Sequence, residues 1–184
     1  MTDYNNALDN YLIANEYIIQ SKDNYLIHKT KYNIAQIKYY LGYYDEAISL
    51  LQESADYFKE EDDIPYITAL HSMALCYIRL ERFDQSTNIN DLGIKEATRL
   101  EFYNAIPRFV NSEGINQYFK RNYAVSIAKL NETLPSFVKN KDFAGETVTN
   151  FYLGKNYWAM NQPDKAMQFF LKVIKAFTEE NYIF

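Results

Sequence analysis

The sequence predicts an all-α fold of antiparallel helix pairs, with about nine helices in 184 residues. Two observations lead to this prediction. Small residues recur at a nearly constant spacing along the chain, and a short turn pattern precedes each of them. The chain also contains only five glycines and four prolines, which is too few for a turn-rich β sandwich.

The recurring small residue in the second helix of each pair defines the repeat. These anchors are evenly spaced from one repeat to the next: Ala7, Ala47, Ser86, Ser126 and Ala166. A second small residue stands twelve positions before each of the last four: Ala35, Ala74, Gly114 and Gly154. Small residues at this spacing let two antiparallel helices approach closely. We therefore expect Ala35, Gly114 and Gly154 to face a neighbouring helix with no spare room.

This register places the helices along the chain. The second helices of the pairs are expected at 4–20, 44–60, 83–99, 123–139 and 163–179. The first helices are expected at 24–41, 65–80, 103–120 and 143–160. Pro135 is predicted to kink the helix 123–139. Gly93 should weaken the helix 83–99 by roughly 1 kcal/mol relative to alanine.

The turns between these helices contain residues that suit a reversal of the chain. Gly42 in the stretch LGYYDEAISLL is expected to end the helix 24–41 as a C-cap glycine. Arg121-Asn122 and Asn161-Gln162 occupy the same turn later, and asparagine tolerates the left-handed conformation well. An acidic residue followed by an aromatic one is expected to cap each first helix near its positive end. The stretches are KDNYL, EDDIPY, LEFYN, NKDFA and EENYI.

Composition and charge exclude several classes of protein. The net charge is -5 and no cluster of lysine and arginine is present, so we expect no direct nucleic-acid contact. Cys76 is the single cysteine, which excludes an internal disulfide and fits a reducing compartment. The first residues lack the pattern of a signal peptide, and no run approaches the roughly 18 apolar residues of a membrane span. A cytoplasmic protein without membrane contact is predicted.

The sequence contains no recognisable motif for catalysis, metal binding or cofactor binding. No glycine-rich phosphate loop, zinc motif or nucleophile elbow occurs. His28 and His71 lie on different repeats, and Cys76 has no second cysteine or nearby histidine. The acidic run at 60–63 lacks the alternating ligands of a calcium loop. We therefore predict a protein that is not an enzyme and has no metal or cofactor.

The repeat resembles the tetratricopeptide repeat family. The resemblance is carried by NIAQIKYYLGYYDEAISLL, SMALCYIRLERFDQSTNI, EGINQYFKRNYAVSIAKL and YLGKNYWAMNQPDKAMQFF, and it covers nearly the whole chain. It implies a right-handed superhelix, one α-solenoid domain over 1–184, with units near 1–22, 23–62, 63–100, 101–141 and 142–180. The units are longer than the common one, the leading tryptophan is absent, and most units lack the closing proline. HEAT repeats have units of similar length, but the small-residue pair favours the tetratricopeptide interpretation.

The resemblance also implies a ligand groove, because this family lines its concave groove with first-helix residues three or four positions apart. Carried over to this chain, the groove residues are Tyr32, Gln36, Tyr39, His71, Arg108, Asn111, Tyr118, Phe151, Lys155 and Trp158. Aromatic anchors mixed with hydrogen-bonding groups suit an extended peptide or protein segment. The alternative is a solvated inner surface without a dedicated ligand. The carboxylate clamp of chaperone-binding members is not expected, because only Arg108 is cationic at the corresponding positions.

The long units resemble the sensor portions of bacterial regulators, including peptide-pheromone receptors. This second resemblance implies a non-catalytic, peptide- or protein-binding module in signalling or transcription regulation. An assembly scaffold and a regulator of a response-regulator phosphorelay are the alternatives. The chain begins on a second helix and stops where another first helix is due, so we expect a fragment of a longer protein. Otherwise the uncovered helices 4–20 and 163–179 should pack against another subunit, for example in a homodimer.

Overall fold

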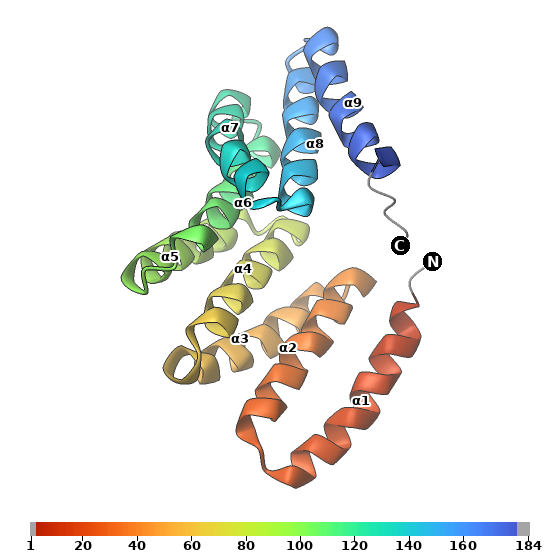
Figure 1. Cartoon of the computed structure of the whole chain (residues 1–184), viewed down its shortest axis with the longest axis vertical. Helices are drawn as coiled ribbons and strands as arrows, with labels where there is room; N and C mark the ends of the chain where they lie inside the picture. The colour runs from red at the N-terminus through yellow and green to blue at the C-terminus, as the bar shows by residue number, and fades with distance from the viewer. Residues whose placement is uncertain (1–2, 180–184) are drawn as a thin grey trace. The chain divides into compact units, whose positions relative to one another are not determined.

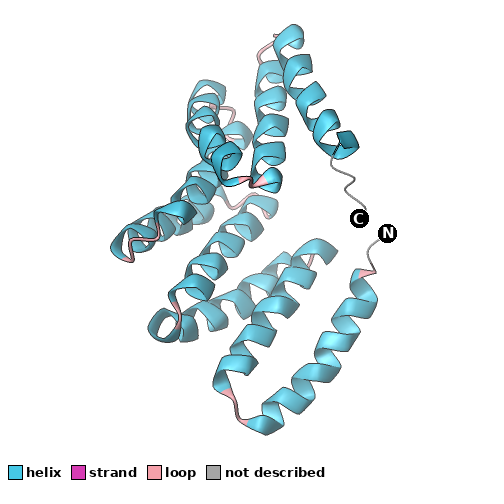
Figure 2. Cartoon of the chain, viewed as in Figure 1, coloured by secondary structure: helices cyan, strands magenta, loops and turns pink. Residues whose placement is uncertain are grey.

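The structure, a computed structural model, describes residues 3–179, which are almost entirely helical (Figure 1). Figure 2 shows the helices joined by short turns, and these residues contain no strand. The elements are α1 (Tyr4–Ser21), α2 (Asn24–Leu41), α3 (Tyr44–Glu61), α4 (Asp63–Arg79), α5 (Phe83–Arg99), the 3₁₀ helix η1 (Tyr103–Ala105), α6 (Ile106–Phe119), α7 (Tyr123–Asn140), α8 (Phe143–Ala159) and α9 (Pro163–Glu179). The predicted all-α class is confirmed.

The chain divides into two compact units, Met1–Glu101 and Phe102–Phe184. The break falls at a predicted repeat boundary. Repeats in a solenoid contact only their neighbours, so a division there is compatible with one array. The single domain over 1–184 stays a prediction, and the last residue of the predicted unit 142–180 lies outside the described residues.

The helix bounds follow the predicted register closely, with one difference at the helix expected over 103–120. Its first turn is the 3₁₀ helix η1, and the α-helix begins only at Ile106. Pro107 follows directly, in the first turn, where a proline's missing N–H is not needed for the helix ladder. Helix α7 continues through Pro135, and the kink there stays a prediction.

Acidic residues cap three of the predicted first helices. Asp23 accepts a hydrogen bond from the backbone N–H of Leu26 at 3.0 Å, and Asp142 accepts one from Gly145 at 2.9 Å. Asp62 does the same for Ile64 at 3.3 Å. The predicted cap in LEFYN is wrong, because η1 begins without a side-chain cap. The stretch EENYI extends beyond the described residues.

Left-handed residues end most helices and explain the regular repeat. They recur at nearly even intervals along the chain: Lys22, Gly42, Glu81, Glu101, Arg121, Lys141 and Asn161. Gly42, with φ of 88°, confirms the predicted C-cap, and its N–H donates to the carbonyl of Tyr39 at 3.1 Å. Because most helices have nearly the same length, each pair with its turns fills one repeat. The turn at Asp62 is the exception, with φ of -157°.

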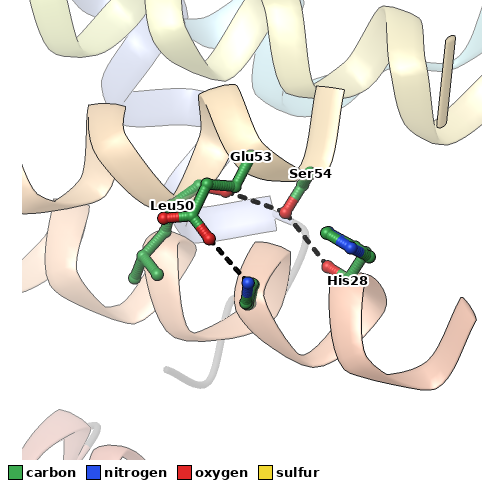
Figure 3. Close-up of polar contacts among 5 residues, drawn as sticks. His28, Leu50, Glu53 and Ser54 are labelled. Atoms are coloured by element: carbon green, nitrogen blue, oxygen red, sulfur yellow. Dashed lines mark hydrogen bonds and ion pairs between the residues drawn. The ribbon is translucent and has the colours of Figure 1, made fainter. Parts of the chain in front are cut away.

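The first unit packs its helices around the predicted small residues. Helix α2 packs against α1 and α3, α4 packs against α3 and α5, and α2 also touches α4. Ala35 and Ala47 are fully buried, and the Ser86 hydroxyl donates to the carbonyl of Ala74 at 3.0 Å. The Ser54 hydroxyl lies 3.0 Å from the carbonyl oxygen of His28 and ties α3 to α2 (Figure 3).

The second unit repeats this arrangement with glycines in α6 and α8. Helix α7 packs against both of these helices, α8 packs against α9, and α6 also touches α8. Ser126 donates to the carbonyl of Gly114 at 2.7 Å. A methyl group on Gly154 would lie 2.5 Å from Cε1 of Phe170, and one on Gly114 would lie 3.0 Å from Leu130. The predicted lack of room at both glycines is confirmed.

Candidate functional site

The first helices of the first unit, α2 and α4, use several predicted groove residues to hold one another. The Gln36 amide donates to the hydroxyl of Ser72 at 2.8 Å. Arg79 donates from Nε to the Tyr39 hydroxyl at 3.2 Å, and its guanidinium lies 5.8 Å from the centre of that ring. These contacts link α2 to α4, so the polar groups of Gln36 and Tyr39 already have partners within the unit.

The other two predicted residues of the first unit are half-buried. Tyr32 lies three positions before the small Ala35, and His71 lies three positions before Ala74, at the equivalent position of the next repeat. Both side chains therefore sit at the edge between the packed interior and the surface. Their role in ligand binding stays a prediction.

In the second unit, two predicted residues are engaged inside the protein. Arg108 is exposed and pairs with the Asp142 carboxylate at 2.9 Å, which links α6 to the start of α8. Asn111 is 6% exposed, and its amide nitrogen donates to Thr149 Oγ1 at 2.7 Å and Thr133 Oγ1 at 3.3 Å. The amide nitrogen of Asn111 therefore already has partners within the unit, and the predicted role of Asn111 in ligand binding stays a prediction. The Asn111 side chain serves the packing of α6, α7 and α8.

Four aromatic rings from α6 and α8 surround the ammonium group of Lys155. The distances from Nζ to the ring centres are 4.7 Å for Tyr118, 5.1 Å for Tyr152, 5.4 Å for Phe151 and 5.6 Å for Phe119. The rings also pack against one another. The ring centres of Tyr118 and Tyr152 are 5.6 Å apart, and those of Phe151 and Tyr152 are 5.5 Å apart. We call these five residues the Lys155 ring cluster.

The Lys155 ring cluster has an exposed apolar edge that continues along α8. Phe151 is 42% exposed and Phe119 is 37% exposed. Trp158 is 64% exposed and lies one turn beyond Lys155, seven positions from Phe151, so the two rings share a helix face. Ring faces attract an ammonium group that lies within about 6 Å of the ring centre. The cluster thus places a lysine ammonium group beside exposed rings.

Sequence reasoning missed three residues. Arg79 contributes to the contact between α2 and α4, and Phe119 and Tyr152 belong to the Lys155 ring cluster. The predicted groove residues were chosen only at positions three or four apart along each first helix. Phe119 and Tyr152 directly follow the predicted Tyr118 and Phe151, and the long side chain of Lys155 reaches all four rings. Allowing for the reach of Lys155 across two adjacent helices could have found both rings.

The described residues offer little chemistry of other kinds. Cys76 is fully buried, and burial raises the pKa of its thiol to about 12, so it stays protonated at neutral pH. Residues 3–179 contain no group of three or more histidine, cysteine, aspartate or glutamate side chains arranged to hold a metal ion. None of the helices in this range combines the length and apolar character that crossing a bilayer requires.

Comparison with known families identifies the repeat. Tetratricopeptide repeat family models match residues 26–89 and 149–179. The chain belongs to the tetratricopeptide repeat family. The predicted family is thereby confirmed in both units. The first match runs from α2 into α5, and the second runs from the middle of α8 to the end of α9. These helices belong to the pairs that the small-residue spacing located.

This tetratricopeptide repeat protein is similar to a curated protein of Bacillus subtilis and to several solved structures. Response regulator aspartate phosphatase J of Bacillus subtilis (strain 168) is 30% identical over 95 residues, which are 52% of this chain and 26% of that protein. The solved Rap conjugation gene regulator of the plasmid pLS20, in complex with the Phr* peptide, has a TM-score of 0.88 at 14% identity. The structural match covers 98% of this chain and 50% of the solved chain.

A second solved structure has the same fold. A Rap protein complexed with Competence and Sporulation Factor has a TM-score of 0.85 at 16% identity, over 98% of this chain and 51% of that chain. This chain thus spans about half the length of these solved proteins. At such identities the similarity establishes the tetratricopeptide-like fold.

Proposed function

We propose that this chain is a non-catalytic peptide-binding module that serves as the sensor region of a bacterial cytoplasmic regulator. The observation that carries the proposal is the Lys155 ring cluster, which combines a cation with exposed rings on the two first helices of the second unit. Two solved neighbours of the same fold are complexes with a peptide or a named factor, which supports this class of ligand.

The chemistry of the cluster suits a short peptide with a carboxylate beside an apolar residue. Phe151 and Trp158 offer exposed ring surface, and burial of aromatic anchors dominates the energetics of such contacts. The Lys155 ammonium group lies over the ring faces and can attract a carboxylate from a peptide C-terminus or an acidic side chain. In the first unit, Gln36 and Tyr39 contribute mainly by holding α2 and α4 together.

Trp158 is the single tryptophan, so its fluorescence reports on this surface directly. A panel of short synthetic peptides, each with a free and an amidated C-terminus, should contain members that shift Trp158 emission. Phe151→Ala should then weaken the best peptide at least tenfold, as at a binding hot spot. Tyr103→Ala is the matched control, because Tyr103 is a 59% exposed ring of the same unit outside the cluster.

Two further variants separate recognition from folding. Lys155→Ala should remove the preference for a free carboxylate, whereas Lys139→Ala, a change at an exposed lysine on α7, should leave it unchanged. Tyr118 is half-buried and contacts Tyr123 and Tyr152, so its truncation tests stability as much as binding. No emission change with any peptide, or equal losses in Phe151→Ala and Tyr103→Ala, would contradict the proposal.

One observation favours a second candidate, a regulator of a response-regulator phosphorelay. The 30% identical segment belongs to a protein named as a response regulator aspartate phosphatase. Binding of purified response-regulator receiver domains, measured by titration in the absence of peptide, would favour this candidate. If the chain bound neither peptides nor receiver domains but recruited two or more proteins together, the assembly scaffold would be favoured instead.

A further inference from the structure

Helix α9 exposes a continuous apolar stripe. Met167 and Leu171 are each 55% exposed and Ile174 is 56% exposed. Their spacing of four and three positions places them on one face of the helix. The helix contacts α8 with a different face, which contains the fully buried Ala166 and the half-buried Phe170. We call Met167, Leu171 and Ile174 the α9 stripe.

Helix α1 exposes a second apolar stripe. Leu12 is 45% exposed and Ile19 is 52% exposed, and the half-buried Leu8 lies four positions before Leu12. These three positions share one face of α1, and we call them the α1 stripe. No residue of α1 is buried, although the helix packs against α2. Helix α1 therefore has apolar surface that another molecule can cover.

The charges beside the two stripes have opposite signs. Helix α1 carries Asp9 and Glu16 and no basic residue, a net charge of -2. Helix α9 carries three lysines against Asp164 and Glu179, a net charge of +1. Lys172 and Lys175 directly follow the stripe residues Leu171 and Ile174 in sequence, and both are exposed. Glu16 stands one turn from Leu12 on α1.

We propose that the α9 stripe of one copy packs on the α1 stripe of a second copy of this chain. Pairing two α9 stripes would bring lysines together, and pairing two α1 stripes would bring carboxylates together. Only the mixed pairing combines apolar burial with opposite charges. Such a contact joins different surfaces of the two copies, so it is heterologous and repeats head to tail unless the ring closes.

Sedimentation velocity over a range of concentrations tests the proposal. The chain has a mass of 21.7 kDa and should form a growing series of oligomers as its concentration rises. Leu12→Asp with Ile19→Asp blocks the α1 stripe, and Leu171→Lys with Ile174→Lys blocks the α9 stripe. Each double variant alone should sediment as a monomer. Val125→Asp with Val138→Lys, at exposed residues of α7, is the matched control and should still associate.

Mixing the two blocked variants gives the decisive measurement. Each variant keeps the surface that the other has lost, so the mixture should form a one-to-one dimer and nothing larger. Two results would overturn the proposal: a wild-type chain that stays monomeric at every concentration, or an α1 variant that still associates by itself through two α9 stripes. Unchanged circular dichroism of each variant ensures that loss of association does not reflect unfolding.

Discussion

The two units use the same repeat register with different interiors. In the first unit the small residues of the first helices are Ala35 and Ala74, and two positions later stand the buried Ile37 and Cys76. In the second unit the small residues are Gly114 and Gly154, and the buried residues at the corresponding positions are asparagines, Asn116 and Asn156. One interior is apolar at these positions and the other is polar.

The buried asparagines of the second unit donate hydrogen bonds from their amide nitrogens to partners within that unit. Asn156 donates to Ser126 Oγ at 2.9 Å and to the carbonyl of Tyr152 at 2.8 Å. Asn116 donates to the buried carboxylate of Glu113 at 3.0 Å. Buried polar groups cost little when such bonds replace those to water. The repeat therefore requires small residues and a fixed helix spacing, whereas apolar character at every core position is dispensable.

The largest loss of stability is expected when a buried asparagine, as found in the second unit, replaces an apolar residue of the first unit. Ile37→Asn loses the burial of an isoleucine and buries an amide in an apolar site, which should cost about 3–5 kcal/mol of unfolding free energy. Asn156→Leu loses two hydrogen bonds but removes a buried carbonyl oxygen without a partner, so it should stay within about 1 kcal/mol of wild type. Urea denaturation measures both, and equal losses would refute the comparison.

A clash at the glycine of α8 should have the next largest effect. Gly154→Leu drives a side chain into the ring of Phe170 and should cost about 1–3 kcal/mol. Ala144→Leu, at an exposed position of the same helix, is the control and should be nearly neutral. An unchanged melting temperature for Gly154→Leu would mean that α9 can shift away from α8.

The two serines that donate to a first-helix carbonyl, Ser86 and Ser126, should contribute different amounts of stability. Ser126 donates to Gly114 and also accepts from Asn156, whereas Ser86 donates to Ala74. Ser86→Ala should cost about 1 kcal/mol, and Ser126→Ala should cost about 1 kcal/mol more because Asn156 also loses its acceptor. Combining Ser126→Ala with Asn156→Leu should remove this difference, because it removes the unpaired donor. Equal losses for the two single variants would show that the Asn156 bond adds no stability.

The smallest expected effect is a pH dependence of stability that arises from His28 in the first unit. His28 stacks on Tyr57 at 4.4 Å, and burial together with the nearby Lys31 lowers the pKa of its imidazole below 6.5, although Glu53 opposes the shift. Below pH 6.5 the unfolded chain therefore binds a proton before the folded one does. The contribution of His28 is fully present above pH 6.5 and is lost as the pH falls through the folded pKa.

His28→Phe should abolish this part of the pH dependence while it keeps a ring against Tyr57. Thermal denaturation between neutral and mildly acidic pH compares the two proteins. A wild-type stability that rose as the pH fell, or a variant with the same slope, would contradict the assignment to His28.

Spacing along the chain was enough to predict most of the fold. The helix pairs, the left-handed Gly42 and the lack of room at Gly154 followed from which small residues recur and at what distance. The caps at Asp23 and Asp142 followed from local chemistry. These features depend on residues close in sequence or on a strict repeat, so a single chain contains the necessary information.

The candidate site was less predictable because it depends on how neighbouring helices meet. The family register placed Asn111 in the groove, but packing of α6 against α7 and α8 turns its amide toward Thr133 and Thr149. The same register selected Lys155, Tyr118 and Phe151 without showing that one cation contacts rings of both helices. Side-chain direction at a helix interface is set by the partner helix, and no spacing rule within one helix contains it.

The sequence by itself determined the helix lengths, the turns and the family, because these follow from local propensity and from a period repeated along the chain. The tertiary structure alone decided which polar residues are used internally and which surfaces stay exposed. Gln36 and Ser72 lie on different repeats yet are bonded, and Lys155 collects rings from two helices. Such contacts form only when helices of neighbouring repeats pack side by side, because packing brings side chains that are far apart in sequence within a few ångströms.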